Sequence, residues 1–149
     1  DAAAFACCEQ SEVSYEGQAP MMLESVASTP SKIVPLSLIQ KSDDFILMDW
    51  RTMVPDLFDK TVPAQIRVAN FHASLIETAW ELTQRCRKKY DFKHIGLAGG
   101  VFQNRILCDG LAERFAQSDI PVVIPSCLPL NDAAISVGQI HEYCSRRSS

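Results

Sequence analysis

The sequence lacks several features that would assign it to a functional class at once. It has no apolar stretch long enough to cross a membrane, although 47% of its 149 residues are hydrophobic. Its formal net charge of −4 argues against a broad nucleic-acid-binding surface. These absences leave one compact domain, or one lobe of a larger domain, with a hydrophobic core of its own. We therefore expect neither a membrane nor a nucleic acid among its partners.

Paired metal-binding and redox motifs are missing too. The six cysteines contain no C-x-x-C pair, and no two histidines have H-x-x-x-H spacing. The chain therefore encodes no zinc ribbon, no thioredoxin-type site and no two-histidine metal site. Cys7 and Cys8 are adjacent, and the other cysteines lie in apolar surroundings. We expect small buried thiols in a reducing, cytoplasmic environment.

The chain also lacks an initiator methionine and a basic leader segment. It opens on Asp1, followed by the apolar residues 2–6. This composition does not fit a signal peptide and resembles a helix entered midway. We expect further sequence before residue 1.

The predicted elements are helix-rich at first and then alternate with strands. Helices are predicted over residues 1–10, 20–27, 54–58 and 63–89, and strands over 33–39 and 45–48 with a hairpin connection at 41–44. Beyond these lie a strand at 94–98, a helix at 104–117, a strand at 121–124, a helix at 131–143 and a short low-complexity tail at 145–149. This later alternation predicts parallel strand pairing with a right-handed crossover, and so an α/β fold.

The pair Gly99-Gly100 directly follows a predicted buried strand. Glycines there let the backbone approach a ligand without an intervening Cβ. The helix that follows offers unpaired N–H groups and a positive dipole end, which attract anions such as phosphate. Asn104 adds a side chain that both donates and accepts hydrogen bonds. Two glycines would equally serve a plain strand-to-helix turn, and the turn alone does not decide between these functions.

Asp132 lies at the start of the last predicted helix, just after a strand. Ligands of open α/β sheets sit beyond the carboxyl ends of the strands, so Asp132 is expected on the same rim as Gly99 and Gly100. A carboxylate there can bind a metal ion. Asn131 or Asp132 would also serve as a helix N-cap, which the spacing alone favours. Both roles can hold, with one residue each.

The turn at residues 14–18 places two polar side chains beside a glycine. Glu16 and Gln18 would be able to hold ribose hydroxyls through paired hydrogen bonds. A solvated turn is the simpler interpretation when this segment is considered alone.

Three separated motifs nevertheless occur together in a specific order and spacing. They are residues 14–19 (SYEGQA) with Met21 and Glu24, residues 97–104 (LAGGVFQN) and residues 129–132 (PLND). The set resembles the C-terminal part of HypF, the carbamoyltransferase family that matures nickel–iron hydrogenases. Smaller matches at Asp49-Trp50, Phe71-His72 and residues 137–139 extend the resemblance over essentially the whole chain.

The resemblance implies an actin/hexokinase-like (ASKHA) ATPase lobe, with a mixed or parallel sheet flanked by helices. Residues 1–149 would form the C-terminal lobe of a carbamoyltransferase domain. In this family, carbamoyl phosphate and ATP give carbamoyl adenylate, and the carbamoyl group passes to the C-terminal cysteine of HypE. The implied cofactors are ATP and a divalent metal, which would be zinc, iron or magnesium. The implied partners are HypE, carbamoyl phosphate and upstream domains of the same protein.

The resemblance also implies roles for particular residues, while it names no catalytic side chain. The metal ligand would be Asp132, and the nucleotide would contact Gly99, Gly100, Asn104, Asp1 and either Glu16 or Gln18. One departure stands out, because Ala133-Ala134 replaces the two glycines that usually follow the Asn-Asp pair. Each alanine adds a Cβ where the backbone approaches phosphate.

Two alternatives remain open. A TsaD-type transferase that acts on tRNA belongs to the same superfamily, although Phe102-Gln103 and residues 16–18 look more like HypF. A lobe that has lost nucleotide chemistry and serves only for docking is the other, and Ala133-Ala134 keeps it open. Because the chain supplies a single implied metal ligand, we expect no turnover from it alone.

Overall fold

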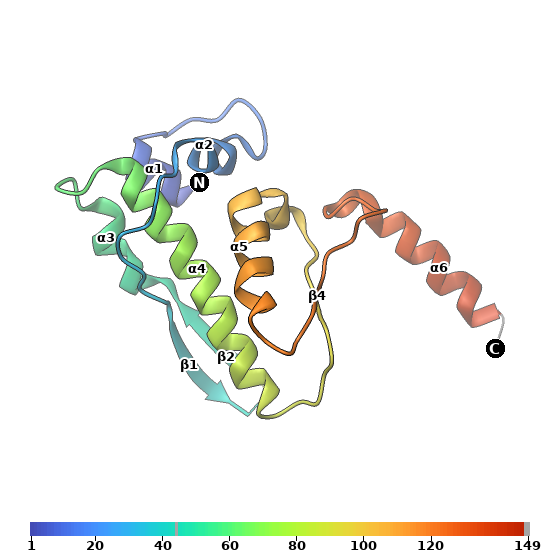
Figure 1. The fold of residues 1–149 in the computed structure, drawn as a ribbon. Helices are drawn as coiled ribbons and strands as arrows, with labels where there is room; N and C mark the ends of the chain where they lie inside the picture. The colour runs from blue at the N-terminus through green and yellow to red at the C-terminus, as the bar shows by residue number, and fades with distance from the viewer. Residues whose placement is uncertain (44, 148–149) are drawn as a thin grey trace.

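The computed structural model describes residues 1–43 and 45–147, with helix α4 (Ala64–Arg87) at its centre. Asp44 of the predicted hairpin connection and residues 148–149 of the predicted tail lie outside the described residues. One side of α4 is covered by α1 (Ala2–Cys8), α2 (Gln18–Val26), β1 (Ser37–Ser42) and α3 (Val54–Phe58) (Figure 1). β2 (Phe45–Asp49) pairs with β1, and the 3₁₀ turn η1 (Trp50–Met53) packs against α3. The strands β1 and β2 pair antiparallel, which confirms the predicted hairpin.

The second half of the chain begins with β3 (Ile95–Gly96), the 3₁₀ turn η2 (Gly100–Gln103) and α5 (Arg105–Ala116), and continues with β4 (Val122–Val123), η3 (Asp132–Ala134) and α6 (Ile135–Arg147). β3 and β4 pair in parallel, with α5 in the connection between them, as the alternating pattern predicted. α5 packs against α4, whereas α6 extends away from the body and is exposed along its described length (Figure 1). None of the helices in the described part of the chain is long and apolar enough to span a membrane.

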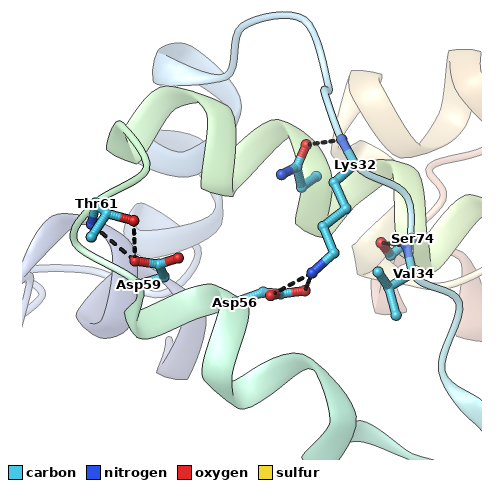
Figure 2. Close-up of polar contacts among 7 residues, drawn as sticks. Lys32, Val34, Asp56, Asp59, Thr61 and Ser74 are labelled. Carbon is cyan, nitrogen blue, oxygen red and sulfur yellow. Dashed lines mark hydrogen bonds and ion pairs between the residues drawn. The ribbon is translucent and has the colours of Figure 1, made fainter.

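The segment before β1 was predicted as a strand from residue 33, and this was wrong for its first half. Three polar side chains of α4, spaced four residues apart, accept hydrogen bonds from this extended segment; they are Asn70, Ser74 and Thr78. The donors are the backbone N–H groups of Ser31, Lys32, Val34 and Leu36. Figure 2 shows Val34 against Ser74, and Lys32 paired with Asp56 of α3. Strand pairing starts only at Ser37, because α4 supplies the earlier acceptors.

Other boundaries are shorter than the sequence predicted. α1 ends at Cys8, and Glu9 adopts a left-handed conformation with φ of 57°. β3 and β4 have two residues each instead of five and four.

All six cysteines are free, but Cys127 and Cys144 are exposed, so the expectation of buried thiols was wrong for these two.

The core forms two clusters that share α4. The first joins α1, α2 and α4 through Ala3, Ala4, Cys7, Ala19, Leu23 and Val68. The second joins the β3–β4 pair and α5 to the distal part of α4 through Leu97, Leu111 and Phe115, with Ile76, Ala79 and Trp80 packed against them. One long amphipathic helix therefore sets the relative position of both halves.

Arg67 fixes the near end of α4. It is 8% exposed, and its guanidinium donates to the carbonyl oxygens of Ala6 at 3.0 Å, Val62 at 3.1 Å and Cys7 at 3.2 Å. It also donates to the carbonyl oxygen of Leu57. The planar guanidinium can satisfy several acceptors at once, so one side chain closes the junction of α1, α3 and α4.

Replacing Arg67 with leucine should strongly destabilise the chain. The change leaves several buried carbonyls without donors, so the free energy of unfolding should fall by about 2–4 kcal/mol. Urea denaturation followed by circular dichroism measures this loss. As a control, Arg146→Ala removes an exposed ion pair with Glu142, and should change stability by less than about 0.5 kcal/mol. Equal effects of the two substitutions would contradict this assignment.

Candidate functional site

Two of the predicted site segments lie side by side at the carboxyl ends of β3 and β4. The backbone N–H of Gly99 donates to the carbonyl oxygen of Leu130 at 2.6 Å. A Cβ built on Gly100 would lie 3.9 Å from the Cβ of Asn131. The glycine turn and the loop that carries Asp132 therefore share one rim, as parallel pairing predicted.

The glycine turn presents unused backbone donors. Gly99 has φ of 111° and ψ of 154°, a backbone conformation that residues other than glycine rarely adopt. The N–H groups of Phe102 and Asn104 close the turn onto the carbonyls of Gly99 and Val101. Within the described residues, the N–H groups of Gly100 and Val101 meet no acceptor. Two adjacent N–H groups without an acceptor can both donate to an anion.

The N-terminus of α5 differs from the expectation of free N–H groups. The N–H of Arg105 donates to Glu24 Oε1 at 3.1 Å, the N–H of Leu107 to Asn104 Oδ1 at 3.0 Å, and the N–H of Cys108 to the Asn104 carbonyl at 3.0 Å. A carboxylate thus already occupies the positive end of the helix dipole. The Gly100 and Val101 N–H groups of the preceding turn have no such carboxylate beside them.

Asn104 is 8% exposed, and both polar atoms of its side chain are engaged. Oδ1 caps α5, while Nδ2 lies 3.2 Å from Nε2 of His72. His72 is 2% exposed, and its Nδ1 lies 2.8 Å from the Val68 carbonyl. The buried Asn104 side chain therefore holds the end of the glycine turn in place through its bonds to α5 and α4. The sequence offered little evidence for His72, apart from its place in the pair Phe71-His72.

The protonation state of His72 follows from its surroundings. Burial lowers the pKa of its imidazole below the ordinary value, against smaller opposing effects of the Val68 carbonyl and the Glu24 carboxylate. Because a carbonyl only accepts, Nδ1 carries the proton of the neutral ring. Nε2 is then the acceptor for Asn104.

Asp132 and Asn131 divide the two roles that the sequence left open. Asn131 Oδ1 accepts from the Ala133 N–H at 3.2 Å and caps the turn η3. The Asp132 carboxylate is exposed and has no hydrogen-bond or ion-pair partner in the described part of the chain. It can therefore supply one oxygen ligand to a metal ion. No group of three or more histidine, cysteine, aspartate or glutamate side chains suited to a metal gathers among residues 1–43 and 45–147.

The turn at residues 14–18 leads directly into α2, which begins at Gln18. Gln18 Oε1 accepts from the Ser14 N–H at 2.6 Å, and Gly17 has φ of 87°, so the amide of Gln18 closes the turn. Glu16 is exposed, and Asp1 begins α1 without a side-chain cap. Farther along α2, Glu24 Oε1 accepts from the Arg105 N–H at the start of α5. The ribose contacts of Asp1, Glu16 and Gln18 stay predictions.

Comparison with known proteins gives one family over nearly the whole chain. Residues 1–139 match the family model described as the second subdomain of the Kae1-like domain of carbamoyltransferases. The chain is 30% identical to carbamoyltransferase HypF2 of Cupriavidus necator, over 94% of this chain and 20% of that protein. It is 27% identical to carbamoyltransferase HypF of Synechocystis sp., over 87% of this chain and 17% of that protein.

A solved structure and a second group of enzymes are also similar. The crystal structure of full-length HypF in its phosphate- and nucleotide-bound form matches with a TM-score of 0.83 and 30% identity, over 93% of this chain and 22% of that one. The tRNA N6-adenosine threonylcarbamoyltransferase of Bacillus subtilis is 40% identical over 46% of this chain and 20% of that protein. The chain thus spans about a fifth of the length of these relatives.

The buried neutral imidazole of His72 predicts that acid destabilises the chain. Burial lowers the pKa of His72 in the folded chain. As pH falls below about 6.5, the imidazole is therefore protonated in the unfolded chain before it is protonated in the folded chain. Stability attributable to His72 should be complete above that pH and fall as pH drops further, by at most about 1.4 kcal/mol per pH unit. Urea denaturation of wild type and His72→Gln at a series of pH values isolates this contribution. Identical pH profiles would show that His72 does not titrate in this way.

Proposed function

Because this chain belongs to the HypF carbamoyltransferase family, we propose that it forms the C-terminal lobe of an ATP-dependent carbamoyltransferase domain with an actin/hexokinase-like fold. The observation that carries the proposal is the shared rim, where the Gly99 N–H donates to the Leu130 carbonyl and brings the glycine turn beside Asp132. The similar structure of full-length HypF holds phosphate and nucleotide. A nucleotide at this rim is the function that the arrangement supports best.

The protein that contains this lobe would use carbamoyl phosphate and ATP to make carbamoyl adenylate. Water would release inorganic phosphate from carbamoyl phosphate and leave carbamate, and a carbamate oxygen would then displace pyrophosphate from the α-phosphorus of ATP. It would then pass the carbamoyl group to the C-terminal cysteine of HypE. In the transfer step, the bond from the carbamoyl carbon to the adenylate oxygen breaks, a carbon–sulfur bond forms, AMP leaves and the thiol proton is released. Preorganised donors and charge near the phosphates are the main contributions that a protein makes to such chemistry.

Each rim residue has a distinct part in this proposal. The free N–H groups of Gly100 and Val101 donate to phosphate oxygens, and the glycine conformation of Gly99 keeps that approach open. Asp132 supplies one oxygen ligand, with further ligands coming from outside this chain. A divalent metal bound there would neutralise phosphate charge. Asn104 supports the turn with its buried amide instead of touching the nucleotide through its side chain.

The tRNA-modifying alternative has narrower support. The threonylcarbamoyltransferases match between 46% and 62% of the chain, whereas the HypF relatives match 87% and 94%. The net charge of −4 also gives little attraction for a polyanion. HypE is therefore the favoured acceptor. The alternative of a docking lobe without nucleotide chemistry rests on Ala133-Ala134. Whether carbamoyl transfer needs the Asp132 carboxylate decides between the two functions.

Replacing Asp132 with asparagine in the full-length protein should reduce carbamoyl adenylate formation on the order of 100-fold, the scale of losing one electrostatic stabiliser. Release of pyrophosphate from ATP in the presence of carbamoyl phosphate measures the reaction. Asp109→Asn changes another exposed aspartate, on α5, and should leave the rate unchanged. An Asp132→Asn enzyme with full activity would favour the docking lobe instead.

The acceptor can be identified with radiolabelled carbamoyl phosphate. The full-length protein should place the label on the C-terminal cysteine of HypE and should bind tRNA weakly. The isolated chain should give no carbamoyl adenylate, because it supplies one metal ligand. Tight tRNA binding without labelling of HypE would reverse the ranking of the two acceptors, and turnover by the isolated chain would show that the site is complete.

A further inference from the structure

We propose that His72 is a positioning residue for the nucleotide site, acting through Asn104. Its neutral imidazole holds the Asn104 amide in the orientation that caps α5 and ends the glycine turn. This inference rests on the proposed function, since it assigns a nucleotide to the rim. His72 itself lies below the rim, with 2% of its surface exposed, and does not reach the ligand.

The hydrogen bonds that link Val68, His72, Asn104 and Leu107 allow only one assignment of donors and acceptors. The Val68 carbonyl requires a proton on Nδ1 of His72, which leaves a lone pair on Nε2. That lone pair requires the NH₂ end of the Asn104 amide, at 3.2 Å. The amide oxygen then faces the Leu107 N–H, at 3.0 Å. Every donor in this series meets an acceptor, and the amide orientation is fixed by its partners.

A proton on Nε2 breaks this series. The imidazolium N–H would face the NH₂ group of Asn104, so two donors would oppose each other in a buried site. Rotating the amide by half a turn only moves the conflict to the Leu107 N–H. Asn104 also donates its backbone N–H to the Val101 carbonyl at 3.2 Å. A displaced Asn104 therefore disturbs the turn that carries the free N–H groups of Gly100 and Val101.

Few charged groups surround this imidazole. From α2, the Glu24 carboxylate favours the protonated ring, and it is itself held by the Arg105 N–H of α5. The turn η2 contributes residues 100–103, which have no titratable side chain, and the Arg105 side chain is exposed. On α4, the guanidinium of Arg67 is directed to the carbonyls of the α1–α3 junction. Burial outweighs Glu24, so the neutral form persists near neutral pH.

The test compares two substitutions of His72 in the full-length protein. His72→Gln places an amide oxygen near the position of Nε2, so it keeps an acceptor for Asn104 but does not titrate. His72→Leu keeps the bulk and removes the acceptor. The measurement is the Kd for ADP with Mg²⁺, by isothermal titration calorimetry between about pH 5.5 and pH 8, which brackets the ordinary histidine pKa.

His72→Leu should bind ADP about tenfold more weakly at pH 8, the scale of losing a helix cap with its buried amide. His72→Gln should bind like wild type at pH 8 and lose less affinity in acid than wild type does. ADP titrates in the same range, and this contribution is common to all three proteins. A positioning role also predicts that KM for ATP rises more than kcat falls.

The outcomes distinguish a failure of the role of His72 from a failure of the proposed function. ADP binding that His72→Leu leaves unchanged, or a His72→Gln profile parallel to that of wild type, overturns the role of His72 and leaves the nucleotide site standing. Absence of ADP binding by wild type at every pH overturns the proposed function, and the inference with it. If His72→Leu does not fold by circular dichroism, the comparison of His72→Gln with wild type decides alone.

Discussion

The hydrogen bond between the buried amide of Asn104 and the imidazole of His72 is the interaction on which the rim depends. It joins the central helix α4 to the N-terminus of α5. Asn104 Oδ1 accepts from the Leu107 N–H and so caps α5, and the backbone N–H of Asn104 donates to the Val101 carbonyl. These two bonds fix the end of the glycine turn. Glu24 adds a second support from α2. The surface donors are thus held by groups buried beneath them, as preorganisation requires.

The central helix α4 performs a different task on each part of its surface. Near its start, Arg67 gathers the carbonyls of the α1–α3 junction. Along one face, Asn70, Ser74 and Thr78 bind the extended segment that leads into β1. Farther along, Ile76 and Trp80 pack against α5 and the parallel strand pair. The helix α4 therefore relates the rim to the rest of the chain.

Local pattern predicted the order of the elements and the parallel pairing well, because both depend on periodicity and on glycine. It failed at residues 33–36, since their acceptors come from Ser74 and Thr78, about forty residues away. At the site, chain order alone placed Asp132 beside Gly99. It did not reveal that Glu24 occupies the end of α5, or that His72 supports Asn104, because these contacts exist only after tertiary packing. The N-cap was predictable as one of two residues, and the structure assigns it to Asn131.

We expect the phosphates to bind at the glycine turn and not at the N-terminus of α5, where the Glu24 carboxylate already accepts the Arg105 N–H. A crystal structure of the full-length protein with a non-hydrolysable ATP analogue tests it most directly. Phosphate oxygens should lie within hydrogen-bonding distance of the N–H groups of Gly100 and Val101, and the Glu24 carboxylate should still accept the Arg105 N–H. Phosphates seated on the N-terminus of α5, with Glu24 displaced, or a nucleotide bound away from Gly99 and Asp132, would contradict it.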